Sequence, residues 1–350
     1  MTATMPAFRL LGWQQPPELV EVAVPEPGPG QVRVRVAGCG LCHSDLAMAE
    51  MPGEIGRALG WHVPFTLGHE TAGWIDAVGP GTDGAWSQGA GVALASPTSC
   101  GRCRWCRRGQ ENACLHGAVG RGYGRDGGLS GYVLVDDLRA LLPLEDLDPA
   151  TAGPLTDAGA TSYHAVRRVL AHLHEDGTAV VFGVGGLGAF VVQILRAVSP
   201  ARVVAVDPSP LRRALASELG AHQVLDGVDD RTGECLRAVL GGQGADAVID
   251  LVGTDETITA GVGALGAGGA LAVVGAAGGT LRRSWYAALP RDGAVFTFQG
   301  SDLSDARNVI QLAASGSVVT PVEAFALDAV GDAYAALGAG ALTGRAVVHP

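Results

Sequence analysis

The spacing of apolar residues divides the chain into two parts with different predicted structure. In the first 160 residues, short runs such as Gln31–Val36 and Gly73–Val78 alternate apolar with polar positions and are separated by Pro and Gly, which predicts β strands joined by turns. After Thr161, continuous apolar runs precede helical stretches, as Ala179–Phe182 precedes Leu187–Val198. This alternation predicts βαβ units around a parallel sheet. The predicted fold class is therefore α/β, with a second, mainly β domain.

Composition and charge exclude several classes of function. The chain has 350 residues, a length that favours two domains, and a net charge of -11, which argues against nucleic acid as a partner. It contains no lysine, because all 24 basic residues are arginine, and this excludes a Schiff-base lysine, a pyridoxal phosphate enzyme and a P-loop with its usual lysine. The chain has no apolar run of about 20 residues and no secretory signal. We therefore expect a cytoplasmic protein without a membrane span.

Four cysteines lie close together between residues 96 and 116. Without an export signal disulfides are not expected, and clustered cysteines then indicate metal ligands. Their spacing, C-x2-C-x2-C-x7-C, suits a closed tetrahedral zinc site that leaves no position open for substrate. An iron–sulfur cluster is the alternative, but its bacterial pattern ends in C-x3-C-P, whereas Leu115 follows the last cysteine here. The predicted ligands of this structural zinc are Cys100, Cys103, Cys106 and Cys114.

The segment Gly183–Gly188, with the sequence GVGGLG, fits the G-x-G-x-x-G pattern of dinucleotide-binding loops. It follows a strand-like run and opens a helix-like run, and Asp207 closes the next strand 19 residues after Gly188. In that context the loop receives the pyrophosphate and Asp207 the adenosine ribose, which favours NAD over NADP although Arg212 and Arg213 lie nearby. The residues expected to contact the cofactor here are Gly183, Gly185, Gly186, Leu187, Gly188, Asp207, Arg212 and Val274.

A second group of possible metal ligands is scattered along the chain. Cys42, His69 and Asp157 are of residue types that bind zinc, and three protein ligands leave a fourth position open for substrate. Each residue also has a structural interpretation. His69 suits a hydrogen-bonded core position, and Asp157 suits the start of a helix. Cys42 suits a small buried side chain or, with Cys39, a redox pair. Residue types alone leave these alternatives open.

Taken together, these motifs resemble those of the zinc-dependent medium-chain alcohol dehydrogenases over essentially the whole chain. The matching motifs, in the family's order, are Gly-x-Cys-His-Ser-Asp, Gly-His-Glu-x-x-Gly, the four-cysteine lobe and GVGGLG. The run Pro154–Gly159, PLTDAG, is similar to that of bacterial NAD-dependent secondary-alcohol dehydrogenases, where many relatives have a third cysteine. The resemblance implies a GroES-like catalytic domain at residues 1–160 and 301–350, a Rossmann domain at residues 161–300, and a homodimer or homotetramer.

The resemblance also implies a role for each residue of the site. Ser44 receives the alcohol proton, and Asp45 orients a zinc-bound histidine. Glu70 lies behind the metal, and His43 contacts the cofactor pyrophosphate. The protein would then carry two zinc ions, one structural and one catalytic. The implied ligands of the catalytic zinc are Cys42, His69 and Asp157.

The implied reaction is the reversible oxidation of an alcohol, with secondary alcohols of broad range favoured, to a ketone or aldehyde. A metal-polarised alcohol loses its proton through Ser44, and hydride passes to NAD. The shared motifs leave a polyol, aminoalcohol or aldehyde dehydrogenase open. A dinucleotide-binding protein without activity is disfavoured, because Cys42 and His69 are both present.

Two departures from the family pattern bear on the substrate. Ala47 stands where many relatives have the histidine that ends the proton relay, so the proton leaves by water or another group. Ser96 stands where an aromatic residue is common. These small residues predict a roomy apolar pocket that favours bulky secondary alcohols and ketones over ethanol. The candidate wall residues of this pocket are Met51, Trp61, Trp285 and Tyr286.

Overall fold

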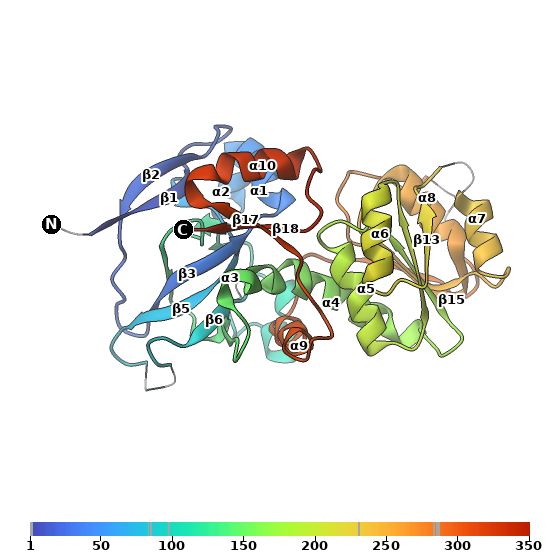
Figure 1. Cartoon of the computed structure of the whole chain (residues 1–350), viewed down its shortest axis with the longest axis horizontal. Coiled ribbons are helices and arrows are strands. Elements are labelled where there is room, and N and C mark those ends of the chain that lie inside the picture. Colours follow the sequence, from blue (N-terminus) through green and yellow to red (C-terminus); the bar gives the residue numbers. More distant parts are fainter. Residues whose placement is uncertain are drawn as a thin grey trace. The chain divides into compact units, whose positions relative to one another are not determined.

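The structure of the protein is a computed structural model that describes residues 3–350 except 83, 85, 97, 98, 230, 231, 283 and 285–287. The chain divides into two compact units, which Figure 1 shows. Unit 1 comprises Met1–Ala160, Gly300–Ala314 and Thr320–Pro350, and unit 2 comprises Thr161–Gln299 and Ser315–Val319. Within the described ranges, none of the helices has the length and apolar character needed to span a membrane.

Unit 1 consists mainly of β strands. Its strands are β1 (Thr4–Leu10), β2 (Glu18–Ala23), β3 (Val32–Gly40), β4 (Phe65–Thr66), β5 (Glu70–Val78), β6 (Gly91–Leu94), β7 (Gly120–Arg121), β8 (Gly124–Arg125), β9 (Tyr132–Val135), β10 (Leu141–Pro143), β17 (Val322–Ala326) and β18 (Arg345–His349). One sheet has the order β2-β1-β4, and a larger one has the order β10-β6-β5-β3-β18-β17, with β9 also paired to β3. The C-terminal strand therefore lies beside a strand from the first 40 residues.

The pair β3 and β5 at the centre of the larger sheet shows why the alternating pattern forms strands. The valines of β3 point into the core and are buried, whereas Arg33 points the other way and its Nε donates to Asp76 Oδ2 at 2.7 Å. Successive side chains of a strand face opposite sides, so this period of two buries one face. The antiparallel register pairs Gly40 with Glu70. The end of β3 and the start of β5 therefore meet at one place.

The helices of unit 1 are short and connect these strands. The α-helices are α1 (His43–Glu50), α2 (Gly53–Ala58), α3 (Pro149–Ala152), α9 (Leu303–Ala314) and α10 (Val330–Gly338), and α4 (Ala158–Val169) runs from unit 1 into unit 2. The 3-10 helices are η1 (Cys106–Arg108), η2 (Glu111–Ala113), η3 (Leu138–Ala140), η4 (Gly153–Thr156) and η6 (Leu327–Ala329). The side chains considered below lie at the ends of α1, β5 and η4.

Unit 2 is a doubly wound α/β layer. Its strands are β11 (Thr178–Phe182), β12 (Arg202–Asp207), β13 (Gln223–Asp226), β14 (Ala245–Asp250), β15 (Leu265–Val273) and β16 (Ala294–Thr297). Its helices are α5 (Gly188–Val198), α6 (Pro210–Glu218), α7 (Thr232–Val239) and α8 (Asp255–Ala264), with the 3-10 helix η5 (Leu170–His172). All strand pairs are parallel, in the order β13-β12-β11-β14-β15-β16. The strand order reverses between β11 and β14, which is where such sheets bind ligands. The predicted fold class is confirmed.

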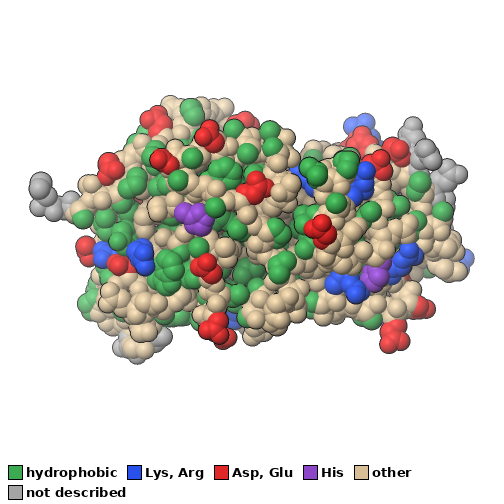
Figure 2. Space-filling model, viewed as in Figure 1, with side chains coloured by type: hydrophobic (Ala, Val, Ile, Leu, Met, Phe, Trp, Pro, Cys, Tyr) green, Lys and Arg blue, Asp and Glu red, His purple; other side chains and the backbone are tan. Residues whose placement is uncertain are grey.

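The charged side chains on the visible surface are dispersed. In Figure 2 the basic side chains lie in small separate groups, several of them next to acidic ones. Binding to nucleic acid needs clustered positive charge. On this face, the described side chains form no continuous basic surface.

Candidate active site

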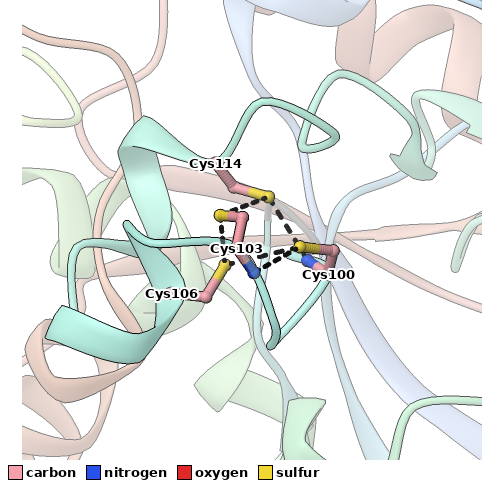
Figure 3. Close-up of side chains that lie close together, drawn as sticks. All are labelled: Cys100, Cys103, Cys106 and Cys114. Carbon is pink, nitrogen blue, oxygen red and sulfur yellow. Dashed lines mark hydrogen bonds between the residues drawn. The ribbon is translucent and has the colours of Figure 1, made fainter.

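The four cysteines of the predicted structural site converge in the structure, as Figure 3 shows. Their sulfur atoms all lie within 4.8 Å of one another, and all four are free thiols. The N–H of Cys103 donates to Cys100 Sγ at 3.3 Å, and the N–H of Cys100 donates to Cys114 Sγ at 3.3 Å. Such donors favour the thiolate form. Four sulfur atoms at this separation fit one tetrahedral zinc ion.

The protonation of these thiols depends on their place in the lobe. Hydrogen bonds from backbone N–H groups, the largest contribution coming from that of Cys106, lower the pKa of the Cys103 thiol to about 6. Burial raises the pKa of Cys106 to about 12, so this thiol needs a bound cation to become a thiolate at neutral pH. The guanidinium groups of Arg104 and Arg108 lie over the Trp105 ring, at 4.5 and 5.8 Å from its centroid.

A second set of metal-binding atoms comes from three separate parts of unit 1. Cys42 precedes α1, His69 precedes β5, Glu70 is the first residue of β5, and Asp157 follows η4. One ligand atom from each lies within 4.8 Å of the others. A Cβ at Gly153 would lie 2.2 Å from the Glu70 carbonyl oxygen, so glycine is required for η4 to approach β5. The scattered residues of the sequence therefore meet at one place.

Asp45 holds the histidine of this set in one orientation. Its Oδ1 lies 3.1 Å from His69 Nδ1, and its Oδ2 accepts the N–H of Cys42 at 3.0 Å. His69 Nε2 then faces the other ligands, 3.4 Å from Asp157 Oδ2. Burial lowers the pKa of His69, but the electrostatic effects of Tyr123 and Asp45 and the contacts with Asp157 and Asp45 outweigh this and hold it well above its ordinary value. The negative groups around the ring thus favour a positive charge at this site, which a metal ion satisfies.

Glu70 is a buried member of this set and pairs with Arg345 of β18. Burial raises the pKa of Glu70 above its ordinary value, although Arg345 opposes the shift. Arg345 also donates to the Leu41 carbonyl oxygen at 2.8 Å, which fixes the chain just before Cys42. A Cβ at Gly40 would lie 2.1 Å from Glu70 Oε2, so this close packing requires glycine. The sequence motifs did not point to Arg345, whose signal is a charged residue directly before the apolar run Ala-Val-Val of the final strand.

The proposed redox pair is not supported by the environment of Cys39. Its thiol is fully buried and lies 3.6 Å from Thr71 Oγ1. Burial raises the pKa of Cys39 to about 12. Because thiolates, not thiols, are the reactive form, this cysteine is inert at neutral pH. Cys42 is the cysteine whose sulfur joins the metal-binding set.

Ser44 lies beside the same histidine and has a second partner that the sequence analysis missed. Ser44 Oγ is 3.5 Å from His69 Nε2 and 3.2 Å from the hydroxyl oxygen of Tyr123. The Tyr123 ring packs on the His69 ring with their centroids 4.5 Å apart. Burial raises the pKa of Tyr123 well above its ordinary value, so the phenol keeps its proton. An aromatic residue between the glycines of RGYGR is the signal that could have drawn attention to it.

The candidate wall residues of the substrate pocket have different environments. Trp61 is buried in the core of unit 1, and its Nε1 donates to the Ala118 carbonyl oxygen at 2.6 Å. Met51 is partly buried and packs on the same core, and Ser96 is buried. Trp285 and Tyr286 lie outside the described residues.

The predicted dinucleotide loop joins β11 to α5 in unit 2. Gly183 has a φ of +84°, and a Cβ at Gly188 would lie 2.0 Å from the Gly183 carbonyl oxygen, so both positions require glycine. A Cβ at Gly185 would have no atom within 4 Å, which leaves the backbone there open to a ligand. Gly186 and Leu187 complete the turn before α5 begins. This backbone fits the approach of a pyrophosphate.

Asp207 ends β12 and turns its carboxylate toward this loop. Its Oδ2 accepts the N–H of Val184 at 2.7 Å, and its Oδ1 accepts the N–H of Ser209 at 2.8 Å. Each carboxylate oxygen can accept a further hydrogen bond. Arg213 is bound to the Asp207 carbonyl oxygen and to the Asp226 carboxylate, both at 2.7 Å. Its guanidinium is therefore held by acceptors of the chain itself.

The remaining predicted cofactor residues lie in both units. His43 is the first residue of α1 and is exposed, as is Ala47 one turn later. Arg212 is half-buried in the first turn of α6, where its N–H donates to the Ser209 hydroxyl at 3.4 Å. Val274 follows β15, and its N–H donates to the Asp250 carbonyl oxygen at 2.8 Å. The described contacts do not test the role predicted for each.

Comparison with known proteins identifies the family. The family model for the alcohol dehydrogenase GroES-like domain matches residues 28–146, and the zinc-binding dehydrogenase model matches residues 186–315. An NAD-dependent alcohol dehydrogenase of Saccharolobus solfataricus is 36% identical over 324 residues, which is 90% of each chain. The chain belongs to the zinc-binding alcohol dehydrogenases.

Other relatives of this zinc-binding alcohol dehydrogenase differ in the activity that they are named for. The D-arabinose 1-dehydrogenase (NADP(+)) of Saccharolobus solfataricus is 32% identical over 348 residues, or 98% of this chain and 97% of the relative. The crystal structure of the Aeropyrum pernix alcohol dehydrogenase has a TM-score of 0.90 and 31% identity, and covers 99% of this chain and 100% of that one. The predicted family, fold class and oxidoreductase activity are confirmed, whereas the role of each site residue stays a prediction.

Proposed function

We propose that this zinc-binding alcohol dehydrogenase oxidises secondary alcohols to ketones with NAD as the hydride acceptor, in a reversible reaction. One observation carries the proposal. Sulfur, nitrogen and oxygen ligand atoms of Cys42, His69 and Asp157 converge within 4.8 Å, and the Ser44 hydroxyl lies 3.5 Å from the same histidine. This donor set suits zinc with one position left for substrate.

Each side chain of the cluster has a task in this proposal. Zinc bound there would supply a Lewis acid that makes the alcohol hydroxyl more acidic. Ser44 accepts the alcohol proton, while Asp45 keeps His69 Nδ1 protonated and turns Nε2 toward the metal. Arg345 balances the buried charge of Glu70, which burial would otherwise penalise.

In this proposal the two units have different functions, catalysis and NAD binding. We propose that residues 1–160 and 301–350 form the catalytic domain, that residues 96–116 hold a structural zinc through four cysteines, and that residues 161–300 bind NAD. In unit 2, the open backbone at Gly185 and the carboxylate of Asp207 support this assignment. A homodimer or homotetramer is also proposed. The edge position of β16 in the sheet, which leaves one side of the strand without a described partner, supports it.

A substrate panel tests the choice of alcohol. We expect kcat/KM for 1-phenylethanol to exceed that for ethanol by about tenfold or more, because a larger apolar group buries more surface in an apolar pocket. Turnover with NAD is measured before and after treatment with a zinc chelator, and we expect the chelator to abolish it. A clear preference for ethanol would contradict the predicted pocket.

The same panel includes D-arabinose with NADP, because a relative that covers nearly the whole chain is named for that activity. This second candidate function predicts turnover of the sugar that exceeds turnover of 1-phenylethanol. The carboxylate of Asp207 argues against it, since a negative charge repels the 2′-phosphate of NADP.

Asp207 also predicts an effect on cofactor binding. Because its carboxylate holds the N–H of Val184 in the glycine loop, Asp207→Asn is expected to weaken NAD binding by about tenfold, or about 1.4 kcal/mol, without creating strong NADP binding. Titration calorimetry with both cofactors measures this. Glu218→Gln, at the exposed end of α6, is the control, for which we expect little change. A switch to tight NADP binding in Asp207→Asn would show that the carboxylate acts on the 2′ position alone.

A further inference from the structure

Tyr123 lies beside the proposed metal site, in a turn between β7 and β8 whose backbone conformation is fixed by hydrogen bonds and glycines. The N–H of Tyr123 donates to the Gly120 carbonyl oxygen at 2.9 Å, and the N–H of Gly120 donates to the Tyr123 carbonyl oxygen at 2.8 Å. Gly122 and Gly124 flank it with φ values of +73° and +77°, which other residues rarely adopt. The backbone thus presents this side chain in one direction.

The ring of Tyr123 is packed between two other rings. Its centroid lies 4.5 Å from that of His69 and 5.8 Å from that of Trp61. A Cβ at Gly124 would lie 2.7 Å from the Trp61 ring, so the turn closes directly onto this tryptophan. Trp61 is itself fixed by its bond to the Ala118 carbonyl oxygen. The phenol therefore has little freedom to move, and its hydroxyl position is set by packing.

The hydroxyl oxygen of Tyr123 lies 3.2 Å from the Ser44 hydroxyl oxygen. The other neighbour of Ser44 Oγ is His69 Nε2 at 3.5 Å, and the proposed function assigns that nitrogen to the metal. A nitrogen that binds a metal has no lone pair left for a hydrogen bond. When the site holds a metal ion, Tyr123 is, among the residues that the structure describes, the remaining hydrogen-bond partner of the Ser44 hydroxyl.

We propose that Tyr123 is a positioning residue for Ser44: its hydroxyl donates to Ser44 Oγ and holds that oxygen in the rotamer that faces the alcohol. The inference rests on the proposed function of the site. A serine hydroxyl has one hydrogen and two lone pairs. Donation from Tyr123 uses one lone pair, so the second can accept the alcohol proton while the serine hydroxyl gives its own hydrogen to a solvent water. Tyr123 neither gains nor loses a proton in this arrangement.

Removing the phenol hydroxyl tests the inference, because Tyr123→Phe keeps the ring packing on His69 and Trp61. Without the bond, Ser44 can occupy other staggered rotamers. We expect kcat for 1-phenylethanol with NAD to fall by about fivefold to tenfold, the effect of one net hydrogen bond, with a smaller change in KM. Zinc content and the thermal unfolding midpoint are expected to match those of the wild type. Tyr132→Phe, in β9, is the matched control and is expected to leave all four quantities unchanged.

A double-mutant cycle separates positioning from a general structural role. If Tyr123 acts through Ser44, Ser44→Ala and the double variant Ser44→Ala/Tyr123→Phe are expected to have the same kcat. Fully additive losses, or an unchanged kcat in Tyr123→Phe, would overturn the inference. Loss of zinc from Tyr123→Phe would overturn it too, since the ring would then serve the metal site itself. A wild type without chelator-sensitive alcohol oxidation would instead overturn the proposed function, and this inference with it.

Discussion

Replacing Asp157 with alanine is expected to lower kcat/KM for alcohol oxidation by more than about 100-fold. Loss of a residue that merely supports a metal ligand costs about 10- to 100-fold, and Asp157 is proposed as a ligand itself. Its Oδ2 lies 3.4 Å from His69 Nε2, inside the cluster that also contains Cys42 and Glu70. Steady-state kinetics with 1-phenylethanol measure the loss. Metal analysis should find about one zinc per chain in place of about two.

Two further variants make the result specific. Asp157→Cys supplies a thiolate of the same charge, so we expect it to retain both zinc ions and part of the activity. Asp148→Ala removes another carboxylate close in sequence, one that caps α3 through the N–H of Ala150 at 2.9 Å, and should leave turnover nearly unchanged. Near-normal turnover in Asp157→Ala would show that the third ligand has been assigned wrongly.

The parts of the protein that the sequence predicts best are those encoded within a short window. The four cysteines lie within 15 positions, and their sulfur atoms converge as the spacing indicates. The glycine loop is also local, because Gly183 has a φ of +84° and Gly188 lies directly against the Gly183 carbonyl oxygen in the same turn. The central strands β11 and β12 of unit 2 contain continuous apolar runs, which their burial on both faces explains.

Strand ends were harder to predict than strand centres. β15 begins at Leu265, although the continuous apolar run ALAVV in the sequence starts only at Ala270. The intervening glycines carry no side chains that reveal a period. In the structure they lie in the strand because Leu265 pairs with Ala245, and a register shift separates that pair from the next. These residues join the strand because their backbone pairs with β14. Their own sequence pattern does not predict it.

The contacts around the proposed metal site depend on distant parts of the chain. Arg345 meets Glu70 across 275 positions because β18 lies next to β3, which pairs Gly40 with Glu70. Tyr123 meets Ser44 across 79 positions through a turn whose shape is set by glycines. No local pattern encodes such pairs. The resemblance to a family supplied the ligand set, but it did not point to these two supporting side chains.

The cysteine lobe predicts an effect on stability, in contrast to the effect of Asp157 on turnover. Cys106→Ala is expected to lower the thermal unfolding midpoint by about 10 °C or more, because zinc binding to such sites contributes folding free energy of roughly 10 kcal/mol. Among its described residues, the lobe contains only the 3-10 helices η1 and η2, and of its four cysteines only Cys106 is buried. Differential scanning calorimetry and zinc analysis measure the change, and limited proteolysis is expected to cut the variant first between residues 100 and 114.

Two comparisons decide whether the lobe zinc is structural. Cys235→Ala removes a partly buried cysteine of α7 that belongs to neither cluster, and it should leave the unfolding midpoint and the zinc content unchanged. Folded Cys106→Ala assayed well below its unfolding temperature should keep most of its kcat, because the lobe site leaves no position open for substrate. A variant that kept full stability but lost turnover would reverse the proposed roles of the two metal sites.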